Sequence, residues 1–276
     1  MTTARLDARF AALKVENRAA FVPYIMAGDP DAATALAILK GLPEAGADII
    51  ELGFPFSDPM AEGPPIQRAA QRALGSGFTL KDTLALSAAF REVDQTTPII
   101  LMGYTNLIES WGYEAFARAA AQAGVDGMII VDTPPEEAGP LADALDAAQV
   151  SLIRLATPTS DDARLAVIAA RTSGFVYYVS VAGVTGVKEA ITAQVAPNVE
   201  RVRRASGLPV AVGFGIRTPE RAAEIARVAD AVVVGSALVD EVAEAVDMNK
   251  DVTNAVLSKV RSLAQAVRAA RSAATV

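Results

Sequence analysis

Two glutamates lie where a carboxylate could act as an acid or a base. Glu51 interrupts the apolar run Ile49-Ile50-Glu51-Leu52, which has the composition of a buried strand. Side chains alternate between the two faces of a strand, so Ile50 and Leu52 share one face and Glu51 takes the other. A carboxylate buried with no Lys or Arg on its own strand has a raised pKa, which suits general acid-base catalysis.

A second carboxylate follows in the loop after this strand. Glu62 opposite Glu51 would give one pocket two acid-base groups, and we expect it to be a better catalytic candidate than Asp58 in the same loop. The alternative for Glu51 is a solvated strand-end carboxylate that caps a loop amide. For Asp58 and Glu62 it is an ordinary surface charge.

The absence of histidine and cysteine limits the catalytic groups and metal sites that the chain could have. It excludes imidazole bases, thiolate nucleophiles and Cys-ligated zinc, and it disfavours a metal-dependent aldolase or epimerase. No lysine ends an expected strand, which disfavours a Schiff-base aldolase. Carboxylate acid-base chemistry remains.

Glycines in three later loops favour a phosphate site. Backbone N–H groups at such loops bind anions, and Ser236 would begin a short helix whose N-terminus favours phosphate. Tight turns are the alternative for each glycine. The residues predicted to bind phosphate are Gly186, Gly215, Gly235 and Ser236, and those that could line an apolar slot, or simply fill the core, are Tyr24, Met102, Ile129, Tyr177 and Phe214.

Eight short apolar runs alternate with Ala-rich amphipathic segments. We expect strands over residues 21–26, 49–53, 99–103, 127–131, 151–155, 175–180, 209–213 and 231–235. The helices expected between and after them are 32–42, 80–93, 113–123, 135–148, 161–171, 195–205, 219–229 and 254–274. Strands that alternate with helices pair in parallel.

Eight such units without a linker predict one α/β domain over residues 1–276, a (β/α)8 TIM barrel with its active site at the C-terminal ends of the strands. An extra N-terminal helix within residues 1–18 carries Leu6, Phe10 and Leu13 at helical spacing. It would cover the bottom of the barrel or form an exposed arm. A C-terminal helix lies within residues 254–276.

The composition of the chain disfavours several other classes of protein. The chain is 52% hydrophobic and has a formal net charge of −7, which disfavours nucleic acid as a partner. No apolar run approaches the ~20 residues of a membrane span. The N-terminus lacks the apolar core of a signal peptide. These features predict a cytoplasmic protein without membrane partners.

One segment is specific enough to suggest a family. The stretch from Glu51 to Pro64, Glu-Leu-Gly-Phe-Pro-Phe-Ser-Asp-Pro-Met-Ala-Glu-Gly-Pro, resembles the second-strand signature of tryptophan synthase α subunits. The resemblance extends through Phe21-Val22-Pro23-Tyr24, Gly28-Asp29-Pro30, Gly183-Val184-Thr185-Gly186, Gly213-Phe214-Gly215-Ile216 and Gly235-Ser236. It spans all eight units.

The resemblance implies a cofactor-free retro-aldol cleavage of indole-3-glycerol phosphate to indole and glyceraldehyde 3-phosphate. Glu51 matches the catalytic glutamate that protonates the indole ring, and Tyr177 matches a tyrosine near the substrate. Thr185 matches a threonine on a loop that closes over the ligand. Glu62 stands where the family usually has the aspartate that handles the indole N–H, and Pro65 replaces a threonine. Val181-Ala182 replaces a more polar pair.

The resemblance also implies a partner. The family works with a β subunit that holds pyridoxal phosphate and receives the indole, in an αββα heterotetramer with allosteric coupling. By resemblance, the residues expected to touch that partner are Pro55, Asp58, Asn106 and Pro134. Turn-forming or solvated loop residues are the alternative for each.

Three other functions remain open at this point. The chain could be a free-standing lyase that releases indole, or a mainly regulatory subunit in which the altered Glu62 site binds ligand but catalyses little. It could also be another phosphate-binding barrel such as a sugar-phosphate isomerase, which the lack of histidine and the second-strand signature disfavour.

Overall fold

Eight parallel strands close into a barrel in the part of the chain that is described, residues 4–180, 188–213 and 215–271 of a computed structural model. Each strand pairs with its neighbour in sequence, and β1 pairs with β8. The strands are β1 (Ala20–Met26), β2 (Ile50–Gly53), β3 (Ile99–Gly103), β4 (Gly127–Ile130), β5 (Ser151–Ala156), β6 (Val176–Val179), β7 (Val210–Gly213) and β8 (Ala231–Val234). The predicted (β/α)8 barrel is confirmed.

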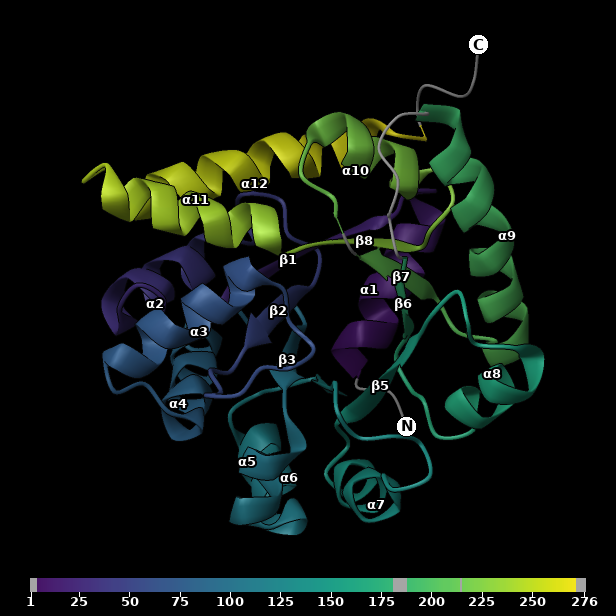
Figure 1. The fold of residues 1–276 in the computed structure, drawn as a ribbon, viewed down its shortest axis with the longest axis horizontal. Coiled ribbons are helices and arrows are strands. Elements are labelled where there is room, and N and C mark those ends of the chain that lie inside the picture. Colours follow the sequence, from purple (N-terminus) through teal and green to yellow (C-terminus); the bar gives the residue numbers. More distant parts are fainter. Residues whose placement is uncertain (1–3, 181–187, 214, 272–276) are drawn as a thin grey trace.

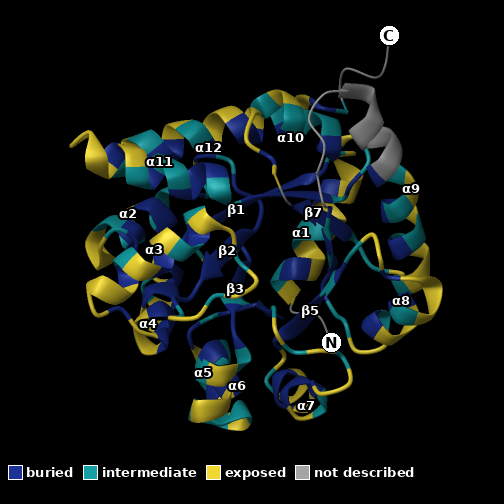
Figure 2. Cartoon of the chain, in the orientation of Figure 1, coloured by how far each residue is buried: buried dark blue, intermediate teal, exposed yellow. Residues whose placement is uncertain are grey.

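Helices form a ring outside the barrel, and α1 lies across its centre in the view of Figure 1. The helices are α1 (Ala4–Val15), α2 (Ala32–Gly41), α3 (Pro64–Gly75), α4 (Leu80–Arg91), α5 (Thr105–Trp111), α6 (Tyr113–Gln122), α7 (Gly139–Ala147), α8 (Asp162–Ala169), α9 (Lys188–Ser206), α10 (Pro219–Ala226), α11 (Ser236–Asp247) and α12 (Val252–Ala269). The strands are buried, and exposed residues gather on the outer helical faces (Figure 2).

The alternation of side chains along β2 determines the direction in which Glu51 points. Ile50 and Leu52 pack in the cluster between strands and helices, whereas Ile49 packs in the cluster inside the barrel. Glu51 therefore points inward, as the sequence predicts.

Helix α1 closes the N-terminal end of the barrel. Leu6 and Leu13 are buried in the interior cluster, and the rings of Phe10 and Phe175 lie 5.9 Å apart. Arg5 pairs with Asp126 at 2.9 Å, and Arg18, just after the helix, pairs with Asp48 at 2.7 Å. The helix is thus a plug rather than an exposed arm.

Local signals explain most helix boundaries. Thr79 and Asp82 form a capping box at the start of α4, and Asp251 caps α12, which begins at Val252, two residues before the predicted start. Gly46 and Gly124 follow helices α2 and α6 with φ of +106° and +76°, the left-handed region that glycine adopts most readily.

Five helices differ clearly from the prediction. The sequence analysis missed α3 and α5. Helix α7 begins at Gly139 rather than at residue 135, and α9 begins at Lys188 rather than at residue 195. Helix α11 runs to Asp247, so it is longer than the short helix expected after Gly235.

Candidate active site

Glu51 lies inside the barrel beside β1 and β3. Its register partners are Tyr24 and Ile100, and only 2% of its surface is exposed. Burial, and secondarily the negative charge of Glu62, raises the pKa of Glu51 to about 8. At neutral pH this side chain is therefore mainly protonated and can donate a proton.

Glu62 lies in the turn between β2 and α3. Its N–H donates to the Pro59 carbonyl at 3.1 Å, and its own carbonyl accepts from the Gln67 side chain at 2.9 Å. Burial raises the pKa of Glu62 to about 7. Since its charge acts on Glu51, the two carboxyl groups share one electrostatic environment.

Two tyrosines converge on these carboxylates. A Cβ added to Gly53 would lie 2.1 Å from the Tyr24 hydroxyl, and one added to Gly213 would lie 2.1 Å from the Tyr177 hydroxyl. Each phenol therefore lies directly over a glycine of the neighbouring strand. Burial and the charges of Glu51 and Glu62 raise the pKa of both phenols well above the usual range, so both are neutral hydrogen-bonding groups.

Tyr104 is a functional candidate that the sequence analysis missed. Its hydroxyl accepts the Ala61 N–H at 3.0 Å, and its ring stacks on Phe56 at 4.9 Å. Burial raises its pKa to about 12, so it stays protonated. Tyr104 therefore fixes the segment that carries Glu62. Its place directly after Gly103 at the end of β3 is the signal that could have identified it.

The predicted phosphate site lies partly in the described structure. Gly235 is the N-cap of α11, and no side chain caps this helix end. The first N–H groups, those of Ser236 and Ala237, precede the intrahelical donors and are available to an anion. Gly215 turns the chain after β7 with a φ of +69°. Gly186 lies outside the described residues.

The predicted apolar slot divides into two layers. Met102 and Ile129 are register partners, but Met102 is half-buried whereas Ile129 is fully buried in the interior cluster. Met102 can therefore border a ligand, and Ile129 lies among the residues that fill the barrel. Thr185 and Phe214 lie outside the described residues.

Comparison with known proteins identifies the family. The model of the family described as tryptophan synthase alpha chain matches residues 10–268. The tryptophan synthase alpha chain of Phenylobacterium zucineum is 79% identical and that of Caulobacter vibrioides 71% identical, each over 98% of both chains. The chain belongs to the tryptophan synthase alpha chain family.

Solved structures agree with this assignment. The subunit alpha of tryptophan synthase from Legionella pneumophila superimposes with a TM-score of 0.90 at 42% identity, covering 97% of this chain and 98% of that one. A chain of Mycobacterium tuberculosis tryptophan synthase gives a TM-score of 0.86 at 37% identity, covering 96% and 99%. As a member of the alpha chain family, the protein is a lyase of tryptophan biosynthesis that cleaves indole-3-glycerol phosphate.

The residues that the family resemblance assigns to a partner differ in exposure. Asp58, Asn106 and Pro134 are exposed on loops or helix ends that follow β2, β3 and β4. Pro55 is buried within the chain. Three of the four are thus on the surface at the end of the barrel that holds Glu51.

Within the described residues, no group of three or more His, Cys, Asp or Glu side chains could hold a metal ion. None of the helices in that part of the chain is long and apolar enough to cross a membrane.

Proposed function

We propose that Glu51 and Glu62 cleave indole-3-glycerol phosphate as an acid-base pair, without a cofactor in this chain. The observation that carries the proposal is the pair of carboxyl groups in one barrel mouth, Glu51 buried and Glu62 half-buried, with pKa values raised to about 8 and about 7. Groups with pKa values near the working pH serve best in proton transfer.

In the first step, Glu51 donates its proton to C3 of the indole ring. The ring nitrogen then carries positive charge, and the Glu62 carboxylate at its N–H stabilises that charge. In the second step, the Glu51 carboxylate accepts the proton of the side-chain hydroxyl. The carbon–carbon bond breaks, its electron pair returns to the ring, and glyceraldehyde 3-phosphate and indole leave.

The other groups position the substrate. The neutral phenols of Tyr24 and Tyr177 flank Glu51 and would orient the hydroxyl that loses its proton. The N-terminus of α11 at Gly235 and Ser236, together with the turn at Gly215, would hold the phosphate. Met102 would border the indole ring.

The variant Glu51→Gln tests the proposal. We expect it to lower the rate of indole release by at least about 10²-fold, because the amide cannot donate the proton. It should still bind a substrate analogue that lacks the reacting hydroxyl. The exposed Glu114→Gln is a matched control that should keep full activity. Turnover within tenfold of the unchanged protein would exclude Glu51 as the acid.

We further propose that the chain, folded as one domain, acts in the cytoplasm within an αββα complex, and that indole passes to a β subunit that holds pyridoxal phosphate. The exposed Asp58, Asn106 and Pro134, on the same end of the barrel as Glu51, support such a contact. Sedimentation with the cognate β subunit tests it: Asn106→Lys should weaken the complex, while Lys40→Glu on α2 should not. Indole release that is unchanged by the β subunit would favour a free-standing lyase.

A further inference from the structure

Two arginines from separate elements converge on one carboxylate of α11. Arg217 follows β7, and its Nη2 donates to Oδ2 of Asp240. Arg68 of α3 lies at the other oxygen of the same carboxylate, with its Nη2 3.5 Å from Oδ1. Helices α3 and α11 pack side by side, with α3 below α11 in Figure 1. The cluster contains two guanidinium groups and one carboxylate, and it therefore carries one net positive charge.

This cluster lies at the end of the barrel where the phosphate would bind. Asp240 follows Ser236 by four residues, about one turn of α11, so the two side chains lie on the same face of the helix. Arg217 comes two residues after Gly215. The charged side chains are open to solvent, since the exposed fraction is 56% for Arg68, 52% for Arg217 and 31% for Asp240. An approaching anion can therefore reach both guanidinium groups.

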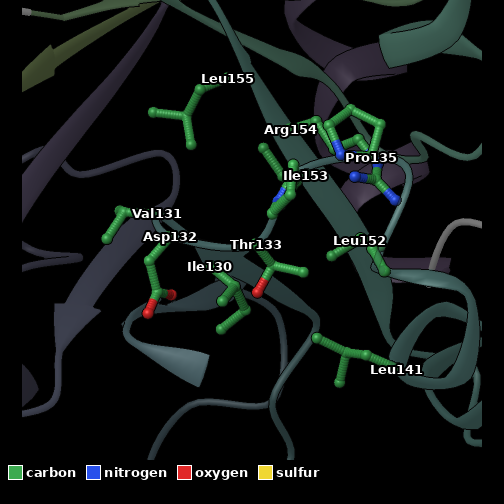
Figure 3. A pocket seen from close by; sticks show the side chains of 12 residues that line it. Ile130, Val131, Asp132, Thr133, Pro135, Leu141, Leu152, Ile153, Arg154 and Leu155 are labelled. Carbon is green, nitrogen blue, oxygen red and sulfur yellow. The ribbon is translucent and has the colours of Figure 1, made fainter. Parts of the chain in front are cut away.

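The opposite side of the barrel mouth is mostly apolar. A cavity of about 280 Å³ lies there between β4 and β5 (Figure 3), and β4 is four strands away from β8 in the closed ring of eight. Val131 and Leu155, which pack against the interior cluster, line this cavity. Of its lining residues, Asp132 and Arg154 carry charge, and Arg154 is buried. A phosphate is thus favoured on the side of β7 and β8, and an indole ring on the side of β4 and β5.

The charge of the whole chain opposes the approach of an anionic substrate. The formal net charge is −7, and Glu62 adds a half-buried carboxyl group in the same mouth. A phosphate monoester carries about two negative charges at neutral pH. It therefore approaches most readily where the local charge is positive, and the rate of such an approach depends on ionic strength.

We propose that Arg68 and Arg217 attract the phosphate of the substrate to the N-terminus of α11, while Asp240 holds the two guanidinium groups in place and reduces their net charge. This inference rests on the proposed function, because it takes the phosphate site at Gly235 and Ser236 as given. The two arginines act on the approach and binding of the phosphate rather than on proton transfer. Their removal should therefore raise KM and leave kcat nearly unchanged.

Indole release at several salt concentrations tests the proposal. At low salt we expect Arg68→Met and Arg217→Met each to lower kcat/KM about threefold through KM, and Arg217→Lys, which keeps the charge, to retain most of the activity. The loss should disappear near 1 M salt, where the Debye length falls to about 3 Å. Arg227→Met is the control, because this exposed arginine ends α10 and should not affect KM.

The variant Asp240→Asn separates an effect of charge from an effect of structure. It removes the negative charge and leaves both arginines, so kcat/KM at low salt should rise. If the cluster only braced α3 against α11, Asp240→Asn and Arg217→Met would both lower the activity. A fall in kcat/KM for Asp240→Asn would therefore overturn the proposal. Arginine variants with an unchanged KM, or with a loss that does not depend on salt, would overturn it as well.

Binding of sn-glycerol 3-phosphate to the full chain, measured by calorimetry at low salt, distinguishes this inference from the proposed function. We expect saturable binding that weakens about threefold in Arg68→Met and in Arg217→Met. If the unchanged chain shows no saturable binding, the proposed phosphate site is wrong and this inference falls with it. If the unchanged chain and both arginine variants bind equally well, the phosphate site stands and this inference alone is overturned.

Discussion

Glu62 is one methylene longer than the aspartate that the family resemblance leads us to expect at this position. In this chain Glu62 lies on a short turn held by its own backbone hydrogen bonds and by Gln67. Its carboxyl group acts on Glu51 from that position. The backbone of this turn thus places the longer Glu62 side chain in the same pocket as Glu51.

Shortening this side chain should therefore harm the enzyme. We expect Glu62→Asp to lower kcat by about 10- to 100-fold, because a displacement of ~1 Å in a catalytic group has an effect of that order. Indole release at saturating substrate measures it. A rate that rises instead would favour the regulatory role that the sequence analysis left open.

The raised pKa values of Glu51 and Glu62 determine how we expect kcat/KM to depend on pH. The value of kcat/KM should fall above about pH 8 as Glu51 loses its proton, and below about pH 7 as Glu62 gains one. In Glu62→Gln the negative charge that helps to raise the pKa of Glu51 is gone. The basic limb should then move to lower pH, and a limb that stays in place would contradict the coupling.

The sequence predicts these two carboxylates but not all of their surroundings. Alternation along residues 49–53 is enough to turn Glu51 inward. The role of Tyr104 cannot be predicted in this way, because it depends on a group distant in sequence, the Ala61 N–H.

At the scale of elements, the residue that follows β3 holds the loop after β2 in place. Tyr104, directly after β3, accepts the Ala61 N–H and stacks on Phe56. A loop of this length would otherwise have few fixed contacts. The hydrogen bond thus makes Tyr104 a positioning residue for Glu62.

Tyr104→Phe should lower kcat about tenfold and change the free energy of unfolding by only about 1 kcal/mol, the usual net contribution of one hydrogen bond. The acidic limb of the pH profile, which reports Glu62, should shift as well. Tyr113→Phe on α6 is the control. Activity equal to that of the unchanged chain, with the limb in place, would remove Tyr104 from this role.

Two helices were missed for physical reasons. Pro64 and Pro65 suggest a loop, yet proline is tolerated in the first turn of a helix because its missing N–H has no intrahelical partner there. Helix α5 is short and lacks a capping side chain at Tyr104. The eight strands and most other helices follow from hydrophobic periodicity.

At the scale of the whole molecule, the two ends of the barrel have different roles. The N-terminal end is closed by α1 and by buried ion pairs, whereas the C-terminal end carries the candidate site. Asp126, fully buried, accepts from Arg5 at 2.9 Å, Arg91 at 2.8 Å and the Ile99 N–H at 2.8 Å. Stability and catalysis should therefore be separable by mutation.

Asp126→Asn should lower the free energy of unfolding by about 3–5 kcal/mol, because it leaves the buried guanidinium of Arg91 without its carboxylate. Urea denaturation measures this loss, and kcat of the folded fraction should not change. Asp143→Asn, which breaks an exposed pair with Arg171, should cost less than about 1 kcal/mol. A large fall in kcat for Asp126→Asn would contradict this separation.

Because the phenols of Tyr24 and Tyr177 lie over Gly53 and Gly213, substitutions at the two positions of each pair depend on one another. At either glycine the smallest possible enlargement, a methyl group, collides with the tyrosine on the neighbouring strand. A larger residue at Gly53 therefore requires Tyr24 to move from its place or to become smaller, and the same holds for Gly213 and Tyr177. Substitutions at the two positions of each pair should therefore be correlated among relatives.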